Sequence, residues 1–227
     1  MLSAVGLFGS SSLGAGAFDP EAERQRLVER LRDDARIRDQ RILDAFARTP
    51  RHLFMPEALR HKAYEDRALP LVEQQTISQP TMIAIMLDEL RCEANDRALE
   101  VGGGCGYAAT LLGHLVAEVH AVEIRPTLAE MARATLQLLE TPNVEVHVGD
   151  GRHGLPVLAP FQRILVSAAA PAIPETLVEQ LAVGGRIAVP VDDRFGQTLM
   201  LGQRVAPDQV RWNRGTPCLF VPLVAGG

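Results

Sequence analysis

From residue 97 onward, short apolar runs alternate with longer segments that carry apolar residues at helical spacing. Apolar runs bounded by turn residues predict strands, and the segments between them predict helices. We expect strands over 97–101, 119–123, 144–148, 162–167 and 185–191. We expect helices over 106–117, 126–140 and 174–182. This rhythm predicts an α/β fold with a Rossmann-like, doubly wound, mainly parallel sheet and helices on both faces.

The segments on either side of this core follow other patterns. Pro20 suits a first helical turn, and Asp39 can cap a second helix, so residues 20–48 predict an N-terminal helical extension. Residues 49–80 have little periodicity and several prolines, which indicates loops and short helices. Beyond residue 191, the stretches QTLMLGQ, QVRW and CLFVPLV predict strands that would extend the sheet in antiparallel fashion.

The composition is that of a globular protein. The chain has 227 residues, of which 47% are hydrophobic, and this is enough for one complete core. A formal net charge of −5 argues against a nucleic-acid partner. The chain has no uninterrupted apolar run of about 18 residues, and its N-terminus lacks the basic region of a signal peptide. We therefore expect no membrane contact, and we expect residues 1–19 to form a flexible tail.

The cysteines and histidines predict neither a disulfide framework nor a metal site. Cys92, Cys105 and Cys218 are scattered and form no CxxC pattern, which is typical of a reducing, cytoplasmic setting. The six histidines contain no HExxH pair. His147 and His153 are poorly spaced for one helix face, so we expect no bound metal.

The most informative stretch is ALEVGGGCGYAAT, residues 98–110, where a predicted strand ends and a helix begins. Glycine permits positive φ angles and lets a ligand approach the main chain. The spacing Glu-x-Gly-x-Gly-x-Gly, from Glu100 to Gly106, matches neither common phosphate-binding pattern, and no lysine follows it. A nucleoside without phosphates therefore fits better than NAD or ATP, although a tight turn without a ligand is the simpler alternative.

Two further residues favour a nucleoside. Glu123 ends the next predicted strand and can accept hydrogen bonds from both ribose hydroxyls. Asp150 and Gly151 follow the third strand, where Asp150 can accept from an adenine amino group and Gly151 allows close approach. A surface carboxylate and an ordinary turn are the alternatives for these positions. Together they place candidate ligand contacts at successive carboxyl ends of parallel strands, the edge where open α/β sheets bind ligands.

With these residues the sequence resembles the class I S-adenosylmethionine-dependent methyltransferases. The stretches RHLFMPEALRHKAYEDRALP, QTISQP, LEVGGGCGY, VGDG, SAAAP and GGRIAVPV also occur in the order found in protein-L-isoaspartate O-methyltransferases. They span roughly residues 40–191, and the combination of QTISQP with AAAP is the most specific part. The sequence is therefore similar to that family over most of its length.

The resemblance implies a role for particular residues. Ser78 matches the catalytic serine, and its structural alternative is a cap for the helix that begins near Pro80. The cofactor, S-adenosyl-L-methionine, would contact Thr76, Ile77, Gly102, Gly103, Gly104, Glu123, Ile124, Asp150 and Gly151. The substrate would contact Thr76, Ser78, Ala169, Ala170 and Pro171, with Ala168 in the same stretch beside the methyl-transfer site.

The sequence departs from the family pattern in three places. The family's helix break before Ile37 is commonly glycine, and here it is Arg36. The family usually has a glycine–histidine–glycine run before QTIS, and here Val72, Glu73 and Gln74 occupy it. Fewer glycines would stiffen or shift this loop, and Glu73 would bring a negative charge toward a carboxylate substrate. In the glycine-rich turn, Gly103 and Cys105 replace the usual threonine and serine. Cys105 is either a reactive thiol or a small packed residue.

The expected activity is methyl transfer from S-adenosylmethionine to the α-carboxylate of L-isoaspartyl residues in damaged proteins or peptides. The methyl ester would then collapse through a succinimide, which begins repair. The alternatives are a divergent carboxyl methyltransferase with a dedicated peptide substrate, and a cofactor-binding adaptor without turnover. We expect a monomer with one methyltransferase domain over 20–227. Its parts would be N-terminal helices and a substrate loop (20–95), a cofactor-binding core (96–191) and C-terminal strands (192–227).

Overall fold

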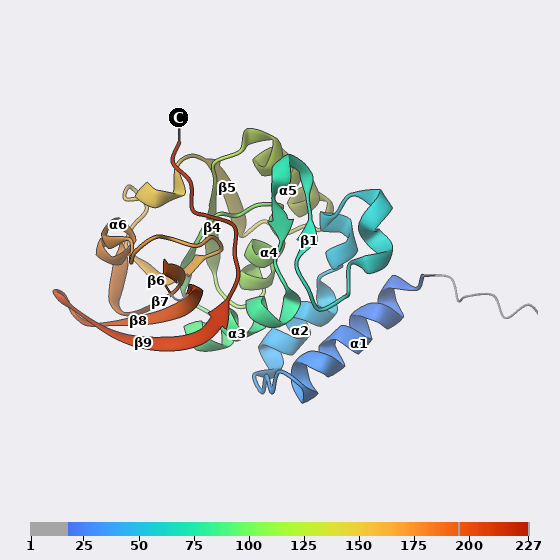
Figure 1. Ribbon diagram of the computed structural model, residues 1–227, viewed down its shortest axis with the longest axis horizontal. Coiled ribbons are helices and arrows are strands. Elements are labelled where there is room, and N and C mark those ends of the chain that lie inside the picture. Colours follow the sequence, from blue (N-terminus) through green and yellow to red (C-terminus); the bar gives the residue numbers. More distant parts are fainter. Residues whose placement is uncertain (1–17, 195, 227) are drawn as a thin grey trace, which may run out of the picture.

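The computed structural model describes residues 18–194 and 196–226. Its centre is a seven-stranded sheet with the order β5-β4-β3-β6-β7-β8-β9 (Figure 1). The parallel strands are β3 (Arg97–Val101), β4 (Glu118–Glu123), β5 (Val144–Val148), β6 (Phe161–Val166) and β7 (Leu181–Asp193). The antiparallel strands are β8 (Gly196–Ala206) and β9 (Gln209–Cys218). The predicted α/β sheet with an antiparallel C-terminal addition is thus confirmed.

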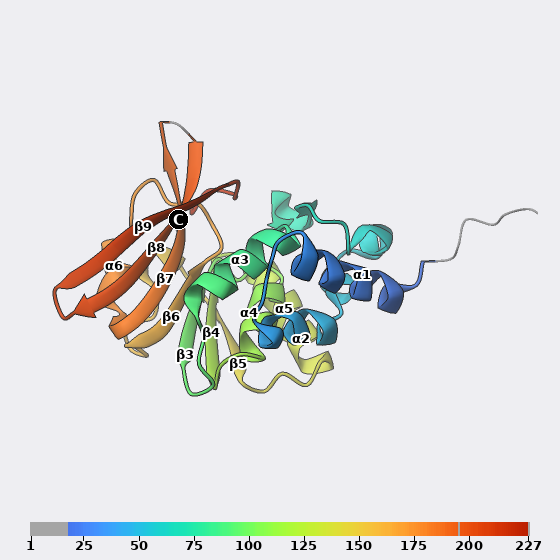
Figure 2. The ribbon, with the colours of Figure 1, turned by 90° about the horizontal axis from the view of Figure 1, so that it is seen from below.

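The helices form layers on both faces of the sheet. The elements α3 (Pro80–Leu90), α4 (Tyr107–Gly113) and α5 (Pro126–Leu138) pack on one face, and the short α6 (Glu175–Glu179) packs on the other. Alternate residues of each strand serve the two layers, so Ala98 joins one core and Leu99 joins the other. Figure 2 shows β8 and β9 at one end of the molecule and the N-terminal helices at the other.

The N-terminal extension begins with two capped helices, α1 (Pro20–Asp33) and α2 (Gln40–Arg48). The Asp19 carboxylate accepts from the backbone N–H groups of Glu21 and Ala22, and Asp39 caps α2 as the sequence predicted. The helices pack on α3 and α4 through α2. Of the predicted tail, residues 1–17 lie outside the described residues.

Residues 49–80 consist of short elements, as their lack of periodicity predicted. They are the 3₁₀ helices η1 (Arg51–Phe54), η2 (Glu57–Lys62) and η3 (Val72–Gln74), and the strands β1 (Leu69–Pro70) and β2 (Thr76–Ile77). The two strands pair with each other in a small antiparallel sheet apart from the main one. A further 3₁₀ turn, η4 (Gly151–His153), follows β5.

The prediction of a strand over CLFVPLV is wrong. β9 ends at Cys218, and residues 219–226, here called the C-terminal segment, pair with the sheet only at an isolated bridge between Ala169 and Pro222. The N–H of Ala169 donates to the carbonyl of Val221, and the N–H of Leu223 donates back to Ala169. The next bond of this parallel ladder would run from the N–H of residue 171 to the carbonyl of Leu223, and it cannot form because Pro171 has no N–H.

The three helices predicted for the core are all shorter than expected, and α5 ends at Leu138 and not at residue 140. α4 ends at Gly113, where the chain turns toward β4, and α6 ends at Glu179 because β7 already begins at Leu181. Within the described residues, every helix is too short or too polar to cross a bilayer.

Candidate active site

A cleft with a volume of about 320 Å³ lies at the carboxyl ends of β3, β4 and β6. The strand order changes direction between β3 and β6, which is where open α/β sheets bind ligands. The volume suits a small organic molecule. The predicted site residues that line it are Thr76, Ile77, Ser78, Gly102, Gly103, Gly104, Glu123, Ile124, Gly151 and Ala168. The structure thus brings five separate stretches of the chain to one edge of the sheet.

The turn after β3 depends on its glycines. Gly102, Gly104 and Gly106 have φ angles of 80°, 53° and 86°, which residues with side chains rarely adopt. Gly103 is restricted by space, because an added Cβ would lie 3.1 Å from the Cβ of Ala121. The turn therefore presents bare main chain to the cleft.

Glu123 is held rigidly at the end of β4. Its Oε2 accepts from the N–H of Gly104 at 2.7 Å, and its Oε1 accepts from the N–H of Arg125 at 2.9 Å. The residue is only 5% exposed. Each carboxylate oxygen has a second lone pair, so Glu123 can still accept hydrogen bonds from two hydroxyl groups of a ligand in the cleft.

Glu100 lines the floor of the same cleft and is fully buried. Its Oε1 accepts from the Ser167 hydroxyl at 2.8 Å, whereas its Oε2 has no partner among the described residues. Burial raises the pKa of Glu100 to about 8, and the nearby charge of Glu123 acts in the same direction. A buried carboxyl oxygen without a partner marks a place where a ligand can supply a polar group.

Ser78 follows β2 and is half-buried at the cleft. Its carbonyl accepts a hydrogen bond from the guanidinium of Arg51 at 2.8 Å, while its hydroxyl has no partner among the described residues. The helix-cap alternative is not supported, because Gln79 is the N-cap of α3 and the Asp66 carboxylate accepts from the N–H of Thr81 in the first turn of that helix. The Ser78 hydroxyl is therefore available to a ligand.

Asp150 does not line the cleft. Both of its oxygens accept from the guanidinium of Arg152, and its Oδ2 also accepts from the N–H of Gly226 at 2.9 Å. The Arg152 guanidinium and this N–H hold the pKa of Asp150 well below its usual range. Asp150 thereby fixes η4, which brings the neighbouring Gly151 to the cleft. Its contact with an adenine group stays a prediction.

The comparison with protein families shows which family the chain belongs to. A model of the family "Protein-L-isoaspartate(D-aspartate) O-methyltransferase (PCMT)" matches residues 22–227. The chain belongs to this family.

Individual relatives agree with this assignment. A protein-L-isoaspartate O-methyltransferase of Roseiflexus sp. (strain RS-1) is 50% identical over 204 residues, which cover 90% of this chain and 93% of the relative. One from Burkholderia ambifaria (strain ATCC BAA-244) is 45% identical over 216 residues, or 94% of this chain and 69% of the relative.

Two solved structures share the fold. One, a protein-L-isoaspartate O-methyltransferase, has a TM-score of 0.80 and 29% identity and covers 90% of this chain, and this chain covers 66% of it. The other is a putative protein-L-isoaspartate O-methyltransferase of Plasmodium falciparum in complex with S-adenosyl-L-homocysteine. It has a TM-score of 0.77 and 22% identity, with coverage of 88% of this chain and 98% of that one.

The loop that departs from the usual sequence of the PCMT family has a glycine-like conformation. Glu73 and Gln74 have φ angles of 53° and 58°, the left-handed region that favours glycine. The Glu73 carboxylate forms an ion pair with Arg125, with 3.3 Å between Oε2 and Nη1, and both residues line the cleft. The negative charge of Glu73 is thus balanced within the protein.

The AAAP stretch of this PCMT protein reaches the cleft only at its first residue. Ala168 lines the cleft, whereas Ala169 and Ala170 are buried and hydrogen-bonded to Val221 and to Pro190. Pro171 is exposed. The assignment of Ala169, Ala170 and Pro171 to substrate binding stays a prediction.

Of the two alternatives for Cys105, a reactive thiol or a small packed residue, the structure supports the packed residue. It is 5% exposed, and burial raises the pKa of its thiol to about 11. A thiol of this kind stays protonated and is a poor nucleophile near neutral pH.

Several residues of the cleft were not assigned from the sequence. They include Glu100, Tyr107, Arg125 and the C-terminal segment at Val221, Pro222, Leu223 and Val224. Glu100 had a visible signal, because it begins the glycine spacing. The C-terminal segment had none, since its place depends on a contact between Ala169 and residues 221–223 that are distant in sequence.

Proposed function

We propose that this chain transfers a methyl group from S-adenosyl-L-methionine to the α-carboxylate of L-isoaspartyl residues in proteins or peptides. The resulting ester would form a succinimide and begin the repair of the damaged site. The observation that carries the proposal is that Ser78 and the glycine-rich turn line one cleft in a chain of this family. We further propose that residues 20–227 form one domain, with the parts given above, that acts as a cytoplasmic monomer without nucleic-acid or membrane partners.

The residues of the cleft fit the cofactor. The bare turn at Gly102–Gly104 would allow its tail to lie close, and the unpartnered Glu100 Oε2 offers a partner for a polar group of that tail. Glu123 would accept from the ribose hydroxyls, beside Ile124. Ile77 and Gly151 would contribute apolar surface and space. When bound, S-adenosylmethionine supplies an electrophilic methyl group on a sulfonium.

On the acceptor side, the protein has to orient an anion that is already reactive. An α-carboxylate is ionised near neutral pH, so the site needs no strong base. The Ser78 hydroxyl would donate a hydrogen bond to this carboxylate and align it, with Thr76 beside it. The cleft walls would exclude water from the reacting atoms. Ser78 is therefore a positioning group that touches substrate and does not remove a proton.

The two alternative functions differ in measurable ways. The altered segment at residues 72–74 motivates the dedicated-peptide alternative, and the Glu73–Arg125 ion pair balances the one charge that this segment adds. To test the proposal, we would incubate the full chain with methyl-labelled S-adenosylmethionine and an isoaspartyl peptide. The same peptide with normal aspartate is the matched control. Base-labile label on the isoaspartyl peptide alone is expected. Cofactor binding without transfer would instead indicate the adaptor, and equal labelling of both peptides would contradict isoaspartyl specificity.

A further inference from the structure

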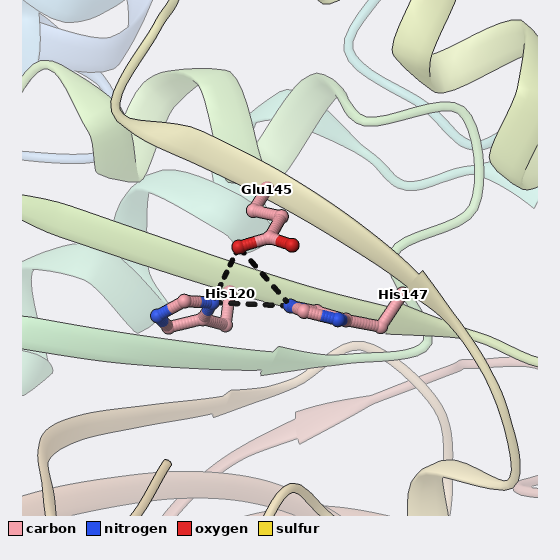
Figure 3. Close-up of side chains that lie close together, drawn as sticks. All are labelled: His120, Glu145 and His147. Atoms are coloured by element: carbon pink, nitrogen blue, oxygen red, sulfur yellow. Dashed lines mark hydrogen bonds and ion pairs between the residues drawn. The ribbon is translucent and has the colours of Figure 1, made fainter.

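Three potential metal ligands meet on the edge of the sheet that is formed by β4 and β5 (Figure 3). The Nδ1 of His120 lies 3.1 Å from the Nε2 of His147. One carboxylate oxygen of Glu145 lies 3.6 Å from the first nitrogen and 3.8 Å from the second. His120 pairs with Glu145 in the strand register, and His147 follows two residues later, so all three side chains lie on one face.

These distances are close to the separations between ligand atoms in a tetrahedral zinc site. Zinc–nitrogen and zinc–oxygen bonds are about 2.0–2.2 Å, so two neighbouring ligands of a tetrahedral site lie about 3.3–3.5 Å apart. The three observed separations scatter around that value. We propose that His120, Glu145 and His147 bind a zinc ion, with the fourth position open to water. Two imidazoles and one carboxylate suit zinc better than magnesium or calcium, which prefer oxygen ligands alone.

Glu118 orients the His120 ring and sets which of its nitrogens can bind a metal. Its Oε1 accepts from the Nε2 of His120 at 2.9 Å, which fixes the proton on Nε2 and leaves the lone pair on Nδ1. The other oxygen of Glu118 accepts from the Nε of Arg97 at 2.7 Å. Arg97 in turn donates to the carbonyl of Leu158. The lone pair of Nδ1 therefore faces His147 and Glu145, as in the carboxylate–histidine pairs of zinc sites.

Burial and exposure are graded across the cluster. His120 is 3% exposed and packs against the ring of Phe161, whereas the side chains of His147 and Glu145 are 24% and 67% exposed. A rigid inner ligand is thus combined with outer ligands that solvent and metal can reach.

The site is separate from the methyl-transfer cleft, because none of its three ligands lines that cleft. Its ligands come from two strands, and β5 is the outermost strand at its end of the sheet. A bound ion would join β5 to β4 by bonds that do not depend on the backbone ladder. Because the unfolded chain lacks this arrangement, zinc would stabilise the folded protein.

The test uses the full chain after metal removal, with Zn²⁺ itself in calorimetric titrations and Co²⁺ as a spectroscopic probe. We expect one Zn²⁺ per chain, a higher melting temperature with zinc, and the visible bands of tetrahedral Co²⁺. The variants His147→Gln and Glu145→Gln should lose these responses. Glu118→Gln should weaken binding by about 10–100-fold, because it acts through the orientation of His120.

Matched controls separate this site from other ligands. His61→Gln removes an exposed histidine elsewhere, and Cys218→Ser removes the most accessible thiol; both should bind zinc as the wild type does. The proposal is overturned if His147→Gln binds zinc with unchanged affinity, or if the wild type fails to bind at about 1 mM zinc. His147→Gln should keep methyl transfer, so neither result bears on the proposed function.

Discussion

The Nη2 of Arg51 donates a hydrogen bond to the carbonyl oxygen of Ser78 over 2.8 Å. The Nε of the same guanidinium donates to the carbonyl of Ala63 at 2.7 Å, and its carbon lies 4.7 Å from the ring centre of Tyr107. Arg51 is fully buried, and burial lowers its pKa. The buried guanidinium of Arg51 thus joins η1 to the main chain of Ser78, the residue proposed to bind the methyl acceptor.

The first prediction concerns this arginine. Arg51→Lys cannot make both hydrogen bonds in the same geometry or lie flat on Tyr107, and we expect the free energy of unfolding to fall by about 2–3 kcal/mol. Methyl transfer should fall more than cofactor affinity. Chemical denaturation and steady-state kinetics measure these two effects. The exposed Arg48→Lys is the control and should change neither. Wild-type stability in Arg51→Lys would show that Arg51 does not fix the segment.

The second prediction concerns Ser78 itself. Ser78→Ala removes a hydroxyl that has no partner within the described residues, so we expect nearly unchanged stability. The rate of methyl transfer should fall by about 10–100-fold, because the substrate carboxylate loses its alignment. Binding of S-adenosylhomocysteine, measured by calorimetry, should stay the same. A variant that keeps the full rate would remove Ser78 from the mechanism.

The third prediction concerns Glu73 and Arg125, which form an ion pair that lines the cleft. Glu73→Gln leaves a net positive charge, so the KM for an anionic isoaspartyl peptide should fall. Arg125→Gln leaves a net negative charge, so the KM should rise. The two side chains are each about one-third exposed, so each change should be only about two- to five-fold and should shrink at high salt. Shifts of the same sign in both variants would contradict this account.

The fourth prediction follows from the raised pKa of Glu100. Its folded value of about 8 lies above the ordinary value of 4.5, so the folded state retains a proton that the unfolded state has lost. The associated stability is complete below about pH 4.5 and is lost as the pH rises toward 8. Glu100→Gln has no such proton and keeps the contact with Ser167.

Denaturation of both proteins at several pH values between 5 and 8 measures this difference. The wild type should lose more unfolding free energy across the range than Glu100→Gln. Other titrating groups are common to the two proteins and cancel in the comparison. Parallel curves for the two proteins would mean that Glu100 is ionised in the folded state.

The fifth prediction concerns the left-handed loop. Gln74→Gly relieves the unfavourable φ of 58° but adds freedom to the unfolded chain, so we expect a net stabilisation of about 0.5–1 kcal/mol. Gln75 has a φ of −92°, so Gln75→Gly provides the matched control and should destabilise by a similar amount. Destabilisation by both substitutions would show that Gln74 carries no backbone strain.

Local patterns were enough to predict much of this molecule. The strands at 97–101 and 144–148 match the structure residue for residue, because apolar runs between turn residues are short-range signals. The glycine-rich turn was predictable for the same reason, since positive φ angles restrict its residues. Glu123 lies where the strand alternation placed it.

The parts that escaped prediction depend on contacts between distant residues. The hydrogen bond from the N–H of Gly226 to Asp150 joins residues 76 positions apart and leaves no local signal in the sequence. The His120–His147 pair arises from the register of two parallel strands, and the sequence does not specify that register. Residue spacing along one helix cannot reveal a cluster whose members come from two strands. Arg51 carries no local signal of its link to Ser78, 27 positions later.

The hydrogen bond between Arg51 and Ser78 has a consequence for how the enzyme could be altered. The methyl donor is proposed to lie at the edge of the main sheet. Ser78, which is proposed to align the acceptor, is held by Arg51 of η1, outside that sheet. Selectivity for the acceptor could therefore be redesigned by exchanging residues 49–79 as a cassette that carries its own arginine anchor, while the nucleoside-binding scaffold is kept intact.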